Sequence, residues 1–141
     1  LEFRRVLFRS RTLSTTQLIK AKSIMENIVA QNYPGTKAHL DFGDGGYPPM
    51  TRTDGNMKLL NFYSQVSVDL GFGPQEAVDP RMAGAADVSF ANDYVTMALD
   101  GIGIAGADGH TVKETANINY VAIEAKRSAV LIYRLANGEF K

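Results

Sequence analysis

Glycine and proline interrupt this chain at many points, and these breaks limit the length of every helix or strand that it can form. Tyr33-Pro34-Gly35 ends one stretch of helical apolar spacing, Gly71 follows a second, and Asn137-Gly138 closes a third. Residues of these types stop helices because they favour turns or left-handed backbone. We therefore expect three helices, at about residues 13–32, 54–70 and 120–135.

Each expected helix has an apolar stripe that predicts its buried face. The stripes contain Leu18, Ala21, Met25 and Ile28 in the first helix, Leu59, Phe62, Tyr63, Val66 and Leu70 in the second, and Ala122, Ala125, Ala129, Ile132 and Tyr133 in the third. In the third helix, Lys126, Arg127 and Arg134 then form the solvent-exposed face.

Short extended segments are expected between the helices. Residues 36–42 alternate, with Ala38, Leu40 and Phe42 on one face, which predicts a half-buried strand. Brief strands are also expected at 75–79 and 95–99, and a short helix is expected to open at 84–88. Helices and strands alternate along the chain, so the predicted fold class is α/β.

The chain divides into three parts by composition. Residues 1–10, LEFRRVLFRS, mix three arginines with apolar residues and lack an initiator Met, so we expect a non-native leader similar to translated adapter sequence, with native sequence missing upstream. The alternative is a native edge strand or frayed helix. A glycine- and proline-rich stretch at 43–49 predicts a boundary between a domain at 11–49 and another at 50–141.

Charge and cysteine content exclude several classes of function. The formal net charge is zero, which removes the attraction for nucleic acid or anionic membrane that a basic chain has. No apolar run reaches the roughly 20 residues of a membrane-spanning helix. There is no cysteine, so any metal site must use His, Asp or Glu. The cellular compartment stays open, because cysteine-free chains occur in all of them.

His110 is the strongest candidate for chemistry. It follows an expected strand and a glycine-rich loop, 101–110, with Asp108 two residues before it and Glu114 four after. Loops at strand ends are where open α/β sheets bind ligands, and imidazole is the commonest metal ligand. A catalytic zinc needs three protein ligands, which one histidine cannot supply. The alternative is an exposed or merely hydrogen-bonded side chain.

Other candidates carry weaker signals. Gly84 and Asp87 stand at the start of an expected short helix, where small residues expose backbone N–H groups to a bound carboxylate. Asp87 could equally be a first-turn carboxylate favoured by the helix dipole. His39 lies on the polar face of its strand, which favours a solvated role. GIGIAG (101–106) matches a dinucleotide fingerprint literally, but residues 107–110 separate it from any helix.

Four segments carry a resemblance to a known family. GAADVSFA (84–91), LDGIGIAGADGHTVKE (99–114) and AKRSAVLIYRL (125–135) are similar to the end of the zinc-dependent aminoacylase/carboxypeptidase family, which includes glutamate carboxypeptidase. DFGDGGYPPM (41–50) resembles the point where these enzymes leave a small lid domain. The resemblance covers residues 13–137, and the block around His110 is its most specific part.

The resemblance implies a function and a set of site residues. It implies that 50–141 is the carboxyl-terminal part of a two-zinc exopeptidase catalytic domain, and that 11–49 is a helix and strand of a ferredoxin-like lid that also forms a homodimer. His110 would be a zinc ligand, and Gly84 and Asp87 would lie near the substrate. The other ligands and the catalytic glutamate would lie upstream, so the chain alone is expected to be inactive.

The substrate is expected to be a peptide or N-acyl amino acid that loses a carboxyl-terminal residue such as glutamate. Some relatives carry an arginine where this chain reads Gly46-Tyr47-Pro48, which leaves a preference for acidic residues open. Two alternatives come from other classes. The chain could be a small, metal-free α/β binding or dimerisation module, or, more distantly, a nucleotide-binding protein that uses the glycine run.

Overall fold

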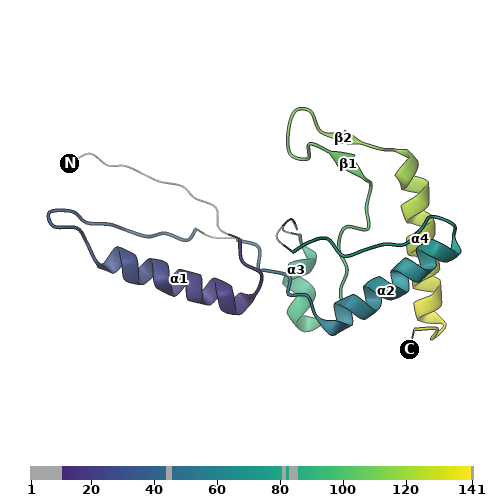
Figure 1. The fold of residues 1–141 in the computed structure, drawn as a ribbon, viewed down its shortest axis with the longest axis horizontal. Coiled ribbons are helices and arrows are strands. Elements are labelled where there is room, and N and C mark those ends of the chain that lie inside the picture. Colours follow the sequence, from purple (N-terminus) through teal and green to yellow (C-terminus); the bar gives the residue numbers. More distant parts are fainter. Residues whose placement is uncertain (1–10, 44–45, 81, 83–85, 141) are drawn as a thin grey trace.

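The structure is a computed structural model that describes residues 11–43, 46–80, 82 and 86–140. Figure 1 shows an elongated molecule in which one helix stands apart from the rest. In chain order the elements are α1 (Thr15–Ala30), α2 (Asp54–Asp69), α3 (Val88–Ala91), the 3-10 turn η1 (Asn92–Tyr94), β1 (Gly106–Ala107), β2 (Thr115–Ala116) and α4 (Asn119–Ala136).

The three long helices confirm the helix predictions to within about two residues at each end. Their limits follow from local chemistry. The side-chain oxygen of Ser14 accepts a hydrogen bond from the Gln17 N–H at 3.2 Å, and that of Thr53 accepts one from the Asn56 N–H at 3.1 Å. Gly71 follows α2 with φ +79°, a left-handed angle that suits glycine and ends the helix.

The three expected strands are absent from the described part of the chain. Residues 36–42, 75–79 and 95–99 have no strand partner there, and the one sheet consists of β1 and β2. These two pair antiparallel, with Gly106 opposite Ala116. A strand is defined by hydrogen bonds to a neighbour, so alternation alone cannot produce one. The α/β class and the boundary at 43–49 stay predictions.

The core lies between α2 and α4. Tyr63 and Val66 of α2 pack with Leu131 of α4, and all three side chains are buried. Partly buried apolar residues surround them: Leu59, Phe62, Leu70, Leu99 and Val130. The stripe predicted for residues 54–70 therefore does face the core.

The predicted buried face of α4 is wrong. Ile132 and Tyr133 are each 65% exposed, and Ala122, Ala125 and Ala129 are exposed as well. The buried residues of α4 are Arg127 and Leu131. The helix meets α2 through the face that contains Arg127 and Leu131. Burial of Arg127 is tolerated because Glu124 and the Phe72 carbonyl accept hydrogen bonds from its guanidinium.

A buried polar network fixes the loop 95–99 against α2. The side-chain amide of Asn56 donates to Asn92 Oδ1 at 3.1 Å, and its oxygen accepts from the Ala98 N–H at 2.8 Å. Gly55 lies directly against the Thr96 carbonyl, since a Cβ placed on it would stand 2.2 Å from that oxygen. The network holds the start of the glycine-rich segment in place.

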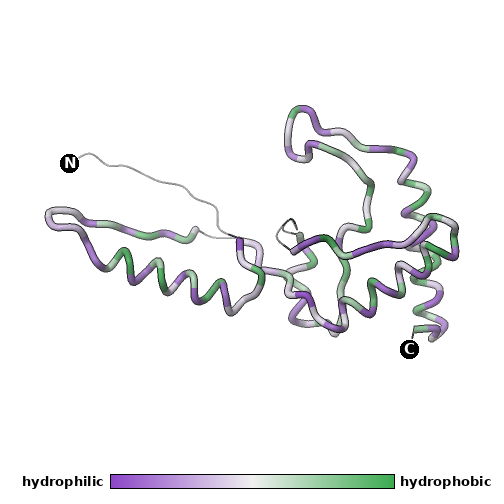
Figure 2. The backbone as a smooth tube through the Cα atoms, viewed as in Figure 1, coloured by the Kyte–Doolittle hydropathy of each residue, from purple (hydrophilic) through white to green (hydrophobic). Residues whose placement is uncertain are grey.

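The helix α1 forms a separate arm. It has no buried residue and contacts no other helix or strand in the part of the chain that the structure describes. The segment after it doubles back along the helix (Figure 1), with the Lys22 ammonium 5.0 Å from the centre of the Phe42 ring. The apolar residues on α1 (Figure 2) include Ile19, Ile24 and Ile28, which are exposed.

None of the described helices is both long enough and apolar enough to cross a membrane.

Candidate functional site

His110 lies in the turn that joins β1 to β2. Its backbone has φ +65° and that of Asp108 has φ +55°, both in the left-handed region that non-glycine residues seldom adopt. Hydrogen bonds hold the turn: the His110 N–H donates to Glu114 Oε2 at 3.2 Å, and the Thr111 hydroxyl donates to the Asp108 carbonyl at 2.7 Å. His110 is exposed, and it stands on a turn whose backbone is held by these hydrogen bonds.

The described residues around His110 do not form a complete metal site. No group of three or more His, Cys, Asp or Glu that could hold a metal ion occurs among the described residues. The His110 ring nitrogens make no hydrogen bond there, whereas the Glu114 carboxylate supports the turn through the backbone. One imidazole can complete a zinc site whose other ligands come from elsewhere, but it cannot form a catalytic site alone.

The structure does not bring Asp87 into contact with His110. Asp87 stands at the start of α3, and its carboxylate accepts a hydrogen bond from the Tyr47 hydroxyl at 3.0 Å. This bond raises the pKa of Tyr47, and the Tyr47 ring lies 5.2 Å from that of Phe90. Gly84 falls outside the described residues. The substrate-binding role of both residues stays a prediction.

His39 is exposed, which agrees with the solvated role expected for it. The glycine-rich run 101–106 leads into β1 rather than into a helix. It therefore lacks the helix N-terminus on which a dinucleotide fingerprint depends.

A second polar site, which the sequence analysis missed, lies between α2 and α4. Arg127 was expected on the exposed face of its helix, but only 4% of it is exposed. Its Nη1 forms an ion pair with Glu124 Oε1, and its Nη2 donates to the Phe72 carbonyl at 3.4 Å. The guanidinium also lies 5.5 Å from the centre of the Phe72 ring. The one available signal was the i, i+3 spacing of Glu124 and Arg127, with Leu131 four residues further on.

Tyr63 joins this ion pair to α2. Its hydroxyl donates to Glu124 Oε2 at 2.5 Å. Burial, and then the hydrogen bond to Glu124, raise the pKa of Tyr63 to about 12. Both carboxylate oxygens of Glu124 thus have a charged or hydroxyl partner.

Of the other two cations expected on the exposed face of α4, Lys126 is indeed exposed. Arg134 is partly buried and reaches α2, where its Nη1 lies 2.6 Å from Asp69 Oδ2. This hydrogen bond lowers the pKa of Asp69.

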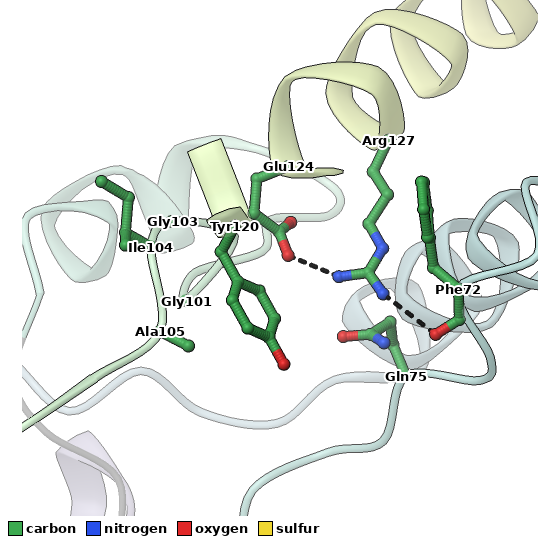
Figure 3. A pocket seen from close by; sticks show the side chains of 9 residues that line it. All are labelled: Phe72, Gln75, Gly101, Gly103, Ile104, Ala105, Tyr120, Glu124 and Arg127. Atoms are coloured by element: carbon green, nitrogen blue, oxygen red, sulfur yellow. Dashed lines mark hydrogen bonds and ion pairs between the residues drawn. The ribbon is translucent and has the colours of Figure 1, made fainter. Parts of the chain in front are cut away.

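A cavity of about 410 Å³ adjoins the ion pair. It lies between the glycine-rich segment 101–105 and the first turns of α4, with Tyr120, Glu124 and Arg127 on the helix side (Figure 3). Gln75 also lines it. The cavity is within the size range of small-ligand sites.

A scan of protein-family models, a search of curated proteins and a search of solved structures found no match to this chain. The resemblance to the zinc peptidase family, which segments 41–50, 84–91, 99–114 and 125–135 suggested, therefore stays a prediction.

Proposed function

We propose that this chain is the carboxyl-terminal part of a zinc-dependent exopeptidase and that His110 is one of its zinc ligands. The observation that carries the proposal is the exposure of the His110 side chain together with the backbone conformation of its turn. Its exposed imidazole stands on a turn that hydrogen bonds hold in an uncommon backbone conformation. Backbone strain of this kind is concentrated at ligand and active sites.

The chain's own part in the reaction is to bind and orient. His110 would coordinate the zinc through the lone pair of a ring nitrogen, and Glu114 holds the turn by accepting a hydrogen bond from the His110 backbone N–H. The bound zinc would supply the Lewis acidity that activates a water toward an amide carbonyl. The remaining ligands and the general base come from upstream sequence in this proposal, and the substrate is a peptide or an N-acyl amino acid.

Exposed apolar side chains on α4 support a larger catalytic domain. Ile132 and Tyr133 form part of a stripe with the periodicity of a buried helix face, yet both are largely exposed. Such a stripe is typical of a surface that packs against further structure. In the proposed enzyme, upstream parts of the catalytic domain cover it.

The test is a histidine substitution in the full-length protein, with hydrolysis of peptides ending in glutamate and zinc content as readouts. We expect His110→Ala to lower the rate by orders of magnitude and to release about one zinc per chain, because a catalytic zinc needs its three ligands. His39→Ala is the matched control, since His39 is the other histidine and is also exposed.

Either of two results would contradict this proposal. One is an unchanged rate and zinc content after His110→Ala. The other is an equal loss after His39→Ala, which would place the effect outside the turn.

The second candidate function is a metal-free dimerisation module, and the exposed apolar side chains of α1 favour it. Ile19 and Ile28 are 64% and 63% exposed on a helix that contacts no other described element. A second copy could cover this face. A concentration-dependent dimer that binds no zinc, and keeps its affinity after His110→Ala, is the result expected of this alternative.

A further inference from the structure

The cavity beside α4 contains hydrogen-bonding groups that the fold does not use. The Arg127 guanidinium has five N–H donors, and its hydrogen bonds to Glu124 Oε1 and to the Phe72 carbonyl engage Nη1 and Nη2. The third nitrogen, Nε, is fully buried, and its N–H has no hydrogen-bond partner in the described chain. A buried donor without an acceptor is unfavourable, so an acceptor that reached this guanidinium would be bound.

Glu124 has hydrogen-bond acceptor positions that are not used. Its two carboxylate oxygens offer about four acceptor positions, and Arg127 and Tyr63 occupy two of them. The cavity wall therefore presents donors and acceptors side by side (Figure 3).

The charges in the cavity wall indicate what kind of ligand fits. Arg127 and Glu124 neutralise each other as an ion pair, so the site has no net charge. A free anion would be repelled by Glu124, and a free cation by Arg127. A neutral amide suits both, because its carbonyl accepts from the guanidinium while its N–H donates to the carboxylate.

The opposite wall of the cavity also offers both donors and acceptors, here from the backbone. The N–H and C=O groups of Gly101, Gly103 and Ile104, which line this wall, make no hydrogen bond within the described chain. Backbone groups in this state pair readily with the main chain of a peptide. The Ala105 carbonyl, by contrast, already accepts from the Asn117 N–H at 2.8 Å.

We propose that this cavity binds a short, uncharged peptide segment through its main-chain amides. One amide lies against Glu124 and Arg127, and the next pairs with residues 101–104. Strand and sheet spacings give roughly 160 Å³ per residue of extended chain. The cavity of about 410 Å³ therefore holds two or three residues. Because the contacts are to the main chain of the peptide, peptides with different uncharged side chains should bind.

The experiment is an NMR titration of the ¹⁵N-labelled chain with acetyl-Thr-Val-Thr-amide, a peptide without charge. We expect saturable shifts of the Gly103 and Ile104 amide signals and of the Arg127 Nε–H signal. The same peptide with N-methylated amides should bind about tenfold more weakly, because it loses its donors.

Two variants test the location. Ala105→Phe fills the cavity from an exposed position and should weaken binding about tenfold or more. Ala107→Phe is the control, since Ala107 is exposed on the same segment but does not line the cavity. It should leave the affinity within about twofold.

Several results would overturn the proposal. No saturable shift at millimolar peptide would do so, as would equal binding of the N-methylated peptide, which indicates apolar contact alone. Preferential binding of acetate would show an anion site instead. Self-association of the chain that Ala105→Phe abolishes, without peptide binding, would assign the cavity to a second copy.

Discussion

At the scale of single residues, Tyr63, Glu124 and Arg127 form a polar link between α2 and α4. Arg127 is buried because Glu124, one turn before it on α4, neutralises its charge, and Tyr63 of α2 reaches the same carboxylate. Hydrogen bonds to a charged group such as the Glu124 carboxylate are stronger than neutral ones, at about 1.5–3 kcal/mol each. The stability of the helix pair therefore depends on the protonation state of Tyr63.

We expect Tyr63→Phe to lower the free energy of unfolding by about 1.5–3 kcal/mol at pH 7. The pKa of Tyr63 is raised to about 12 in the folded chain, above the value of about 10 for an unfolded tyrosine. The contribution is complete below about pH 10 and is lost as the pH rises through 12. Urea unfolding at pH 7 and at several values from 9 to 12 measures it.

Tyr133→Phe is the control for this prediction, because Tyr133 lies on α4 and is largely exposed. Its effect should stay within about 0.5 kcal/mol at every pH. A Tyr63→Phe effect that is constant from pH 7 to 12 would contradict the role assigned to the hydroxyl proton.

At the scale of elements, the amino-terminal turn of α2 positions the loop that leads to the glycine-rich segment. Thr53 caps the helix, and Asn56 then accepts the Ala98 N–H within the first turn. This arrangement requires the loop to approach the helix closely at Gly55, where the Thr96 carbonyl lies. The absence of a side chain at Gly55 makes that contact possible.

We expect Gly55→Ala to destabilise the chain by about 1–3 kcal/mol, as overpacking does. In an unobstructed helix the same change would be favourable by about 1 kcal/mol. Here the new Cβ would stand 2.2 Å from the Thr96 oxygen and push the loop away from α2. Thermal unfolding checks the sign, and faster hydrogen exchange at Ala98 checks the cause. Gly46→Ala is the control and should leave the stability nearly unchanged, because a Cβ at Gly46 meets no atom within 4 Å. Stabilisation by Gly55→Ala would contradict the close contact with Thr96.

At the scale of the whole molecule, the chain consists of one small packed region and one arm. The packed region has Tyr63, Val66 and Leu131 at its centre, whereas α1 has no buried residue. Isolated helices shorter than about 12–15 residues are marginally stable in water, and α1, with 16 residues, is only slightly longer. Its stability should therefore differ from that of α2 and α4.

Hydrogen exchange should show this difference directly. We expect the amides of α1 to exchange with little protection and those in the middle of α2 and α4 to exchange slowest, because among the described helices these two pack on a core. Equal protection in α1 at low protein concentration would show that the arm is covered. Protection that appears only at high concentration would indicate a dimer through α1.

Local chemistry let the sequence by itself determine where the long helices begin and end. Ser14, Thr53 and Gly71 act on neighbouring backbone groups, so their effect does not depend on the rest of the fold. The glycine-rich loop around His110 was likewise predictable, whereas its hairpin geometry was not, because β1 and β2 exist only through each other.

Only the tertiary structure decided which face of α4 is buried. The apolar stripe with Ile132 and Tyr133 predicted one face, but the helix meets α2 through Arg127 and Leu131. Periodicity shows that a helix has an apolar side, yet burial depends on which surface lies opposite. Arg127 is buried because Glu124 and the Phe72 carbonyl meet its guanidinium, and Phe72 is 55 residues away in the chain. A contact between such distant residues has no local pattern, so it arises only when the helices pack.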